Sequence, residues 1–193
     1  DVYFGRAVYH RRRGIPIGAK GWFVDKSRAG GGSLIDIGVH ALDCVWWLMG
    51  SPRPVSVSGS AYSKFAHTVP KGIKYDVDDS AFALIKFANG ATLILEASWA
   101  LNQRGGGIKQ IAGTKGGAEF DPLVIFAERN GMQVDITPKP PQNNAFADQV
   151  RHFVDCIQNR KEPIASASQG ILLMKMLDAV YESSRTGKEV RIR

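Results

Sequence analysis

Two pairs of alternating segments, each joined by the dipeptide Asn-Gly, most narrowly limit what this chain can fold into. The pairs are Ser80–Ala88 with Ala91–Trp99 around Asn89-Gly90, and Leu123–Arg129 with Met132–Thr137 around Asn130-Gly131. Asn-Gly between two strand-like runs is typical of a type I′ turn, because both central residues of that turn need a positive φ. The sequence therefore predicts two antiparallel β-hairpins.

The other segments extend this pattern to a mixed domain. Further strands are expected at Val2–Tyr9, Val55–Tyr62, Ile108–Ala112, Ala118–Phe120 and Val190–Ile192, and helices at Ser33–Met49, around Phe146 to Ile157, and from Ser168 as N-cap to Gly187. This order predicts the α+β fold class, with a mostly antiparallel open sheet that carries helices on one face. The alternating strand–helix order of a nucleotide-binding sheet is not present.

Composition excludes several other classes. An apolar share of 44% in 193 residues is too high for a disordered chain and favours a single domain over residues 1–193. No apolar run approaches the roughly 20 residues that a membrane helix needs. The net charge is +7, but Arg11-Arg12-Arg13 is the one tight basic run, so no nucleic-acid partner is expected. Cys44 and Cys156 lie in apolar helical patterns, which favours reduced thiols and a cytoplasmic location.

The expected helix Ser33–Met49 carries the ionisable residues with the clearest chemical meaning. At about 100° per residue, Asp36, His40 and Asp43 fall on one stripe about 60° wide, while the other positions are almost all apolar. A helix that is apolar nearly all round is buried, so its polar stripe must face a polar partner, water or a ligand. A carboxylate beside an imidazole makes the ring suited to take a proton from a substrate hydroxyl.

Three other interpretations of these residues stay open. Ser33-x-x-Asp36 fits a capping box, in which Asp36 would only bond the first free N–H groups of the helix. His40 could be a core histidine with satisfied hydrogen bonds. A metal held by the stripe is a third option, but His10, His67 and His152 are scattered along the chain and complete no cluster, so no metal is expected.

The glycine-rich and aromatic segments before this helix suggest a substrate site. Gly30-Gly31-Gly32 lacks the spacing of a dinucleotide fingerprint, and we expect it to form a tight turn that lets the helix N-terminus approach a neighbour closely. Trp22 and Phe23 could either wall a pocket, where aromatic faces suit sugar rings, or anchor the loop on the core. Lys26 could donate hydrogen bonds to hydroxyls or be an ordinary surface lysine.

Taken together, these segments resemble the C-terminal domain of the Gfo/Idh/MocA oxidoreductases. The motifs are Arg11-Arg12-Arg13-Gly14-Ile15-Pro16, Gly21-Trp22-Phe23-x-Asp25-Lys26 and Gly30-Gly31-Gly32-x-Leu34-Ile35-Asp36-x-Gly38-x-His40-x-x-Asp43. The tail from Phe146 to Val190 is also similar, so the resemblance covers essentially the whole chain. It implies a dihydrodipicolinate-reductase-like or glyceraldehyde-3-phosphate-dehydrogenase-like C-terminal domain.

The resemblance also implies an activity. A full-length enzyme of this kind would use NAD or NADP, bound mainly by an N-terminal Rossmann domain, to oxidise a sugar, inositol or similar polyol by hydride transfer. By similarity, Asp36 and His40 match the family's active-site pair, with Trp22, Lys26 and Asp43 as candidate substrate-binding residues. The family's Glu-Lys-Pro motif and glycine fingerprint do not occur in these 193 residues, so this chain alone should be inactive.

An assembly role is the alternative hypothesis. One face of Ala91–Trp99 is apolar, whereas the other is mixed and carries Thr92, Ile94, Glu96 and Ser98. If helices cover only one face of the sheet, the other face must be exposed to solvent or covered by another protein surface. We therefore expect a homo-oligomer, a dimer or tetramer, built through that face, and the resemblance implies the same.

Overall fold

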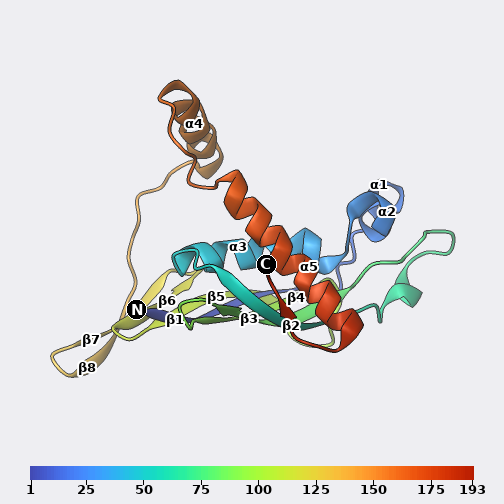
Figure 1. Cartoon of the computed structure of the whole chain (residues 1–193), viewed down its shortest axis with the longest axis horizontal. Helices are drawn as coiled ribbons and strands as arrows, with labels where there is room; N and C mark the ends of the chain where they lie inside the picture. The colour runs from blue at the N-terminus through green and yellow to red at the C-terminus, as the bar shows by residue number, and fades with distance from the viewer.

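The computed structural model describes residues 1–193, apart from the side chain of Ala19, and folds them into one nine-stranded sheet with helices on one side (Figure 1). The strands are β1 (Val2–His10), β2 (Pro54–Tyr62), β3 (Ser80–Phe87), β4 (Thr92–Ser98), β5 (Gly106–Gly113), β6 (Gly116–Phe120), β7 (Val124–Arg129), β8 (Met132–Ile136) and β9 (Val190–Arg191). The longer helices are α3 (Val39–Leu48), α4 (Ala145–Gln158) and α5 (Ala167–Thr186). The predicted α+β class is confirmed.

The strand order is β8-β7-β6-β5-β1-β4-β3-β2-β9. Strand β1 lies between β5 and β4, and its pairing with β4 is parallel, whereas the other paired strands run antiparallel. The parallel pair is possible because α3, β2 and β3 separate β1 from β4 along the chain. The first strand of the chain therefore lies in the middle of the sheet and not at its edge.

The two Asn-Gly turns differ from each other. Asn130 and Gly131 have φ values of 54° and 75°, as a type I′ turn requires. In the first turn only Gly90 has a positive φ, of 84°, and its N–H donates to the carbonyl of Phe87. The type I′ prediction is therefore wrong for Asn89, because a longer loop lets Gly90 alone supply the left-handed residue.

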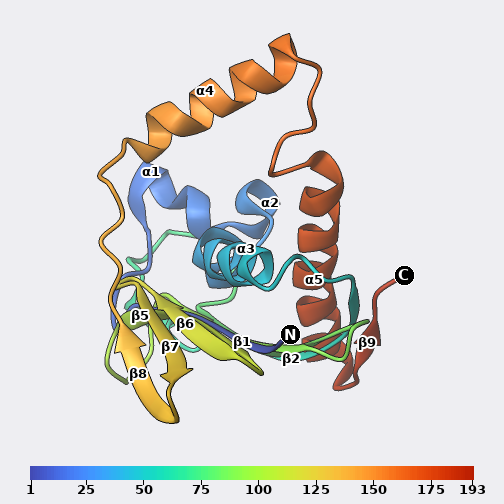
Figure 2. The ribbon, with the colours of Figure 1, turned by 90° about the vertical axis from the view of Figure 1, so that its left-hand side faces the viewer.

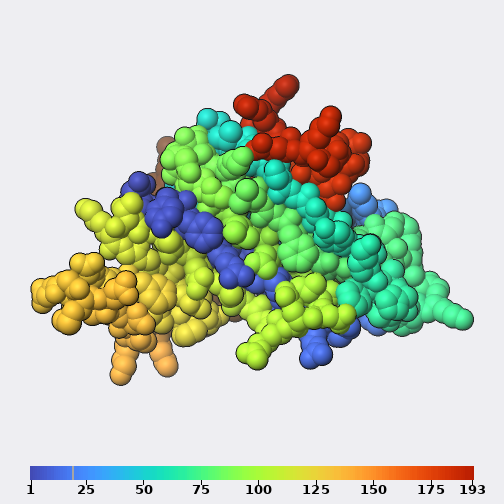
Figure 3. All heavy atoms as spheres, turned by 90° about the horizontal axis from the view of Figure 1, so that it is seen from below, coloured from blue at the N-terminus to red at the C-terminus, as the bar shows by residue number. Residues whose placement is uncertain are grey.

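The main core lies between the sheet and the helices α3 and α5 (Figure 2). On β4 the predicted inward face is confirmed, since Leu93, Leu95 and Ala97 are fully buried. Trp46 of α3 and Leu177 of α5 pack into the same core. Each such large apolar side chain contributes roughly 1.5–3 kcal/mol by leaving water. The opposite face of the sheet carries no helix and is the one seen in Figure 3.

The helix α5 begins two residues earlier than the sequence suggested. Its N-cap is Ser166, which forms a capping box with Gln169, so the prediction of Ser168 is wrong. Both serines precede the apolar stripe, and only Ser166 has glutamine three residues later. The expected end is confirmed, because Gly187 follows the helix with a φ of 67°.

The helix α4 stands apart from the sheet and the other helices (Figures 1 and 2). Its N-cap is Asn144, whose side chain accepts from the N–H of Ala147. One stripe of the helix is apolar yet exposed, with Phe146 at 84%. The other members of this stripe are Val150, Phe153, Val154 and Ile157, and all are at least 44% exposed. None of the residues that the structure describes covers them.

Candidate functional site

The helix predicted as Ser33–Met49 begins with a π-helical turn. Leu34–Gly38 forms this π-helix, and the regular helix α3 follows from Val39 to Leu48. The assumption of a uniform 100° spacing is therefore wrong between Asp36 and His40, because a π-helix places more residues in each turn. Asp36 lies inside the π-helix, whereas His40 and Asp43 lie on α3.

Asp78, from the connection before β3, caps this helix. One carboxylate oxygen of Asp78 accepts from the backbone N–H of Gly32 at 2.8 Å. The other accepts from the Ser33 hydroxyl at 2.8 Å and from the Leu34 N–H at 2.9 Å. The capping-box interpretation is wrong, because Ser33 bonds Asp78 and its side chain does not cap the helix itself.

Tyr181 of α5 completes this cap and explains the glycines. Its hydroxyl donates to Asp78 at 2.6 Å. Burial, followed by the charge and hydrogen bond of Asp78, raises the pKa of Tyr181. A Cβ on Gly31 would lie 2.3 Å from this hydroxyl, and a Cβ on Gly32 would lie 1.8 Å from the Asp78 carbonyl oxygen. The triplet therefore permits a close approach, as the sequence predicted.

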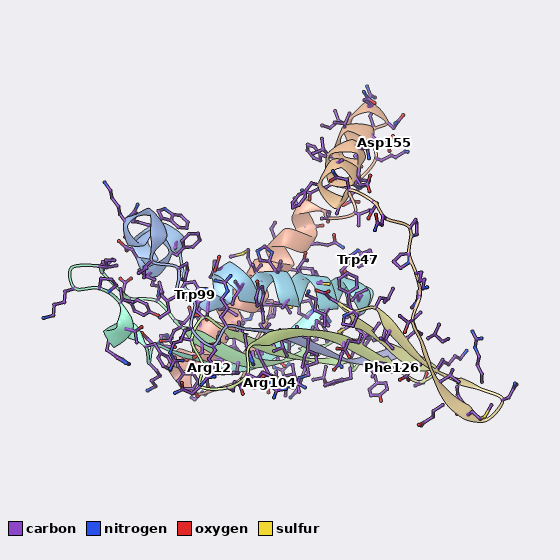
Figure 4. The ribbon with its side chains drawn as sticks, turned by 180° about the vertical axis from the view of Figure 1, so that it is seen from behind. Arg12, Trp47, Trp99, Arg104, Phe126 and Asp155 are labelled. Atoms are coloured by element: carbon purple, nitrogen blue, oxygen red, sulfur yellow. The ribbon has the colours of Figure 1, made fainter. Side chains whose placement is uncertain are left out.

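Trp99, just after β4, holds Asp36. Its indole Nε1–H donates to Asp36 Oδ2 at 2.8 Å, and the ring is fully buried. Figure 4 shows Trp99 below the α1–α2 segment (α1, Gly18–Gly21; α2, Lys26–Ala29), whereas Trp47 lies toward the opposite end of α3. Trp99 belongs to a second, smaller core with Val24, Ile37 and Val77. Asp36 is half-buried beside this core.

His40 and Asp43 lie on the exposed side of α3. Loss of hydration raises the pKa of the Asp43 carboxyl, and the nearby charge of His40 opposes that shift. Among the described side chains, the hydrogen bonds of Asp36 include Trp99 but not His40. His40 therefore lies near Asp43, whereas the Asp36 carboxylate is held by the buried indole of Trp99.

Trp22 begins the 3₁₀ turn Trp22–Val24, and Lys26 begins α2, both next to residues of this second core. Trp22 contacts Phe23 edge to face, with ring centroids 5.1 Å apart, and Phe23 packs against the second core. Trp22 itself is exposed, which fits a loop anchored through Phe23 with one ring left on the surface. The Lys26 side chain is exposed, and its backbone N–H donates to Asp76. Among the described residues, neither side chain forms a hydrogen bond or ion pair with Asp36 or His40.

Three cavities of about 580, 740 and 260 Å³ lie elsewhere on the molecule. The first two are lined mainly by strand residues, and the third by the C-terminal segment and α5. Asp36 and His40 line none of these three, so in this chain His40 lies on an open helix surface. No group of three possible metal ligands gathers among the described residues, and no described helix is long and apolar enough to cross a membrane.

The sequence analysis missed Asp78, Trp99 and Tyr181. Asp78 and Asp79 form an acidic pair directly before β3, but Lys74 and Asp76 precede them, so the local sequence does not mark the pair as buried. For Trp99 the sequence pattern indicated only a place at the end of Ala91–Trp99, on its apolar face. No local signal links these residues to the helix, because the partners lie 44 or more positions away.

Comparison with known proteins agrees with this geometry. Residues 7–192 match the family described as "Oxidoreductase family, C-terminal alpha/beta domain". The chain is 33% identical to D-glucoside 3-dehydrogenase of Escherichia coli, with all of this chain and 57% of the relative covered. It is 28% identical to scyllo-inositol 2-dehydrogenase (NAD(+)) of Bacillus subtilis, with 93% and 55% covered.

A solved structure shows the same fold. Aldose-aldose oxidoreductase from Caulobacter crescentus, complexed with glycerol, superposes with a TM-score of 0.77 at 26% identity, with 99% of this chain and 56% of that chain covered. The chain thus spans little more than half the length of these relatives. It belongs to the Gfo/Idh/MocA oxidoreductase family, as the C-terminal alpha/beta domain.

Proposed function

We propose that this chain is the substrate-binding part of an NAD(P)-dependent dehydrogenase that acts on a sugar, inositol or similar polyol. The observation that carries the proposal is an exposed His40 one turn beyond a carboxylate that is held from the core side by Trp99. The names of the relatives, a glucoside dehydrogenase and an inositol dehydrogenase, support an alcohol on a ring as substrate.

In this proposal His40 handles the proton of the reacting alcohol. Oxidation of a CH–OH group removes a hydride from carbon and a proton from oxygen, and an exposed imidazole can accept that proton. Asp36, four residues before His40 on the same helix, is proposed to supply the negative charge that stabilises the resulting imidazolium. A nicotinamide dinucleotide, when bound, takes up the hydride. Trp22, Lys26 and Asp43 are proposed to contact the substrate.

The residues of this chain do not by themselves fit a dinucleotide. Its one parallel pair, β1 with β4, has no glycine-rich loop leading from a strand directly into a helix. In the triplet Gly30–Gly32, the N–H of Gly30 already donates to the Lys26 carbonyl and that of Gly32 to the Asp78 carboxylate, so these amides are not free to bind a pyrophosphate. We therefore propose that a second, Rossmann-type domain in the complete gene product binds the cofactor.

The helix α4 supports this two-domain arrangement. Its apolar stripe, defined by Phe146, Val150, Phe153, Val154 and Ile157, is exposed, whereas the other two long helices, α3 and α5, pack into the core. The relatives have about two fifths of their length beyond the matched part, enough for one further domain. We propose that this domain covers the stripe. In the complete gene product, hydrogen exchange of the α4 amides should be slow, and fast exchange there would contradict the arrangement.

The catalytic proposal is tested on the complete gene product. Reduction of NAD+ and NADP+ is followed with a panel of aldoses, glucosides and inositols. His40→Ala should lower kcat by about 10²–10⁴ on the best substrate. His67→Ala, an exposed histidine on the 3₁₀ turn Ala66–Thr68, serves as the control and should retain full activity. Unchanged turnover of His40→Ala would exclude His40 as the base.

A second candidate role is assembly through the uncovered sheet face. Phe82, Leu84 and Ile94 lie together there, and the charges of Arg6 and Glu96 neutralise each other at 2.9 Å. Such a neutral, partly apolar face suits a second copy of the chain. Light scattering should show a dimer or tetramer, and Leu84→Lys should shift it toward monomer. A strict monomer at high concentration would refute this role.

A further inference from the structure

The bond between Trp99 and Asp36 differs from an ordinary buried indole contact. Trp46, the other fully packed tryptophan, donates its Nε1–H to the carbonyl of Pro52, six residues along the same connection. Trp99 instead donates to a carboxylate 63 residues away in sequence. A hydrogen bond to a charged acceptor is about twice as strong as a neutral one and also fixes the direction of the acceptor.

The backbone of Trp99 is itself anchored by hydrogen bonds to the Asp79 segment. Its backbone N–H donates to the carbonyl of Asp79 at 2.8 Å, and Ser98 bonds the same carbonyl at 3.2 Å. The Asp79 side chain is fully buried and accepts from the N–H groups of Lys64 and Phe65, both at 2.6 Å. The indole therefore extends from a fixed backbone, and its complete burial restricts the ring.

Asp36 needs such a support because of where it lies. A π-helical turn is less regular than an α-helix, and Asp36 sits in the middle of Leu34–Gly38. Asp78 fixes the start of this turn through Gly32, Ser33 and Leu34, but none of those bonds reaches the Asp36 side chain. The Trp99 indole supplies a fixed point for that side chain.

We propose that Trp99 is a positioning residue for the reaction, which acts by holding the Asp36 carboxylate in the orientation that serves His40. This inference rests on the proposed function of Asp36 and His40. Trp99 is fully buried and touches neither substrate nor cofactor in this proposal; its effect on turnover passes through Asp36. A misplacement of a catalytic group by about 1 Å can cost up to about 10²-fold in rate, which sets the expected scale.

The test is a double-mutant cycle in the complete gene product. Trp99→Phe keeps an aromatic ring and removes the N–H donor, and it should lower kcat about 10- to 100-fold with little change in KM. In the Asp36→Asn background the same substitution should have almost no further effect, because the residue through which it acts is already changed. Trp46→Phe also loses a buried indole and one hydrogen bond, and it should retain wild-type kcat.

A spectroscopic readout separates this inference from the catalytic proposal. In protein labelled with ¹⁵N-tryptophan, Asp36→Asn should move the indole N–H resonance of Trp99 and leave that of Trp46 in place. An unmoved Trp99 resonance, or equal losses from Trp99→Phe in both backgrounds, would overturn the positioning role. Wild-type turnover of Asp36→Asn with a moved resonance would instead overturn the catalytic role of Asp36. The Asp36→Asn spectrum decides the contact even if Trp99→Phe does not fold.

Discussion

Replacement of Asp78 by asparagine tests how the site is built. The carboxylate is 7% exposed and accepts four hydrogen bonds, two on each oxygen. An amide has one oxygen, so its NH₂ group must face two of the four donors. The hydroxyls of Tyr181 and Ser33 can rotate and become acceptors, but the N–H of Gly32 or Leu34 cannot.

The expected cost follows from this count. Either orientation of the amide leaves one backbone N–H unsatisfied in a buried place, which costs about 1–3 kcal/mol. The remaining bonds also lose their charge assistance, and the helix start loses a favourable negative charge worth about 0.3–1 kcal/mol. We expect Asp78→Asn to lower the free energy of unfolding by about 2–4 kcal/mol. For a chain of this size that corresponds to a fall in Tm of roughly 5–15 °C.

Thermal and urea unfolding measure this change. Asp148→Asn is the control, because the Asp148 carboxylate pairs with Arg151 on the exposed surface of α4. Its loss should lower the free energy of unfolding by less than about 1 kcal/mol. A loss below about 0.5 kcal/mol for Asp78→Asn would refute the reasoning, because a buried amide would then have replaced the carboxylate at no cost. Equal losses for both variants would refute it as well.

Two further predictions concern the same cap. Gly32→Ala should destabilise the protein severely, because the new Cβ would lie 1.8 Å from the Asp78 carbonyl oxygen. Gly170→Ala is the control on α5, where a Cβ meets no neighbour, and it should be neutral or stabilising by up to about 1 kcal/mol. Urea unfolding measures both variants, and an unchanged stability of Gly32→Ala would contradict the packing. Folded Tyr181 has a raised pKa and keeps its proton, so stability should be complete below pH about 10 and fall above it, where the unfolded tyrosine ionises. Tyr181→Phe should reduce that alkaline slope, and an unchanged slope would exclude the contribution of Tyr181.

Local chemistry explains which parts of the fold were predictable. The hairpin around Asn130-Gly131 follows from two residues that tolerate positive φ, and the end of α5 follows from Gly187 for the same reason. The first hairpin was correctly placed, but its turn type depended on how many residues the loop uses. The choice between Ser166 and Ser168 depended on a glutamine three residues later.

The sequence by itself determined the element types, the inward face of β4 and the candidate pair Asp36 and His40, because alternation, turn residues and motif spacing are local properties. The tertiary structure alone decided what surrounds that pair. The Asp78 cap and the Trp99 bond join segments 44 and 63 residues apart, and both hold the π-helical turn Leu34–Gly38. Such contacts depend on β1 lying between β4 and β5, and that placement results from packing the whole sheet against its helices.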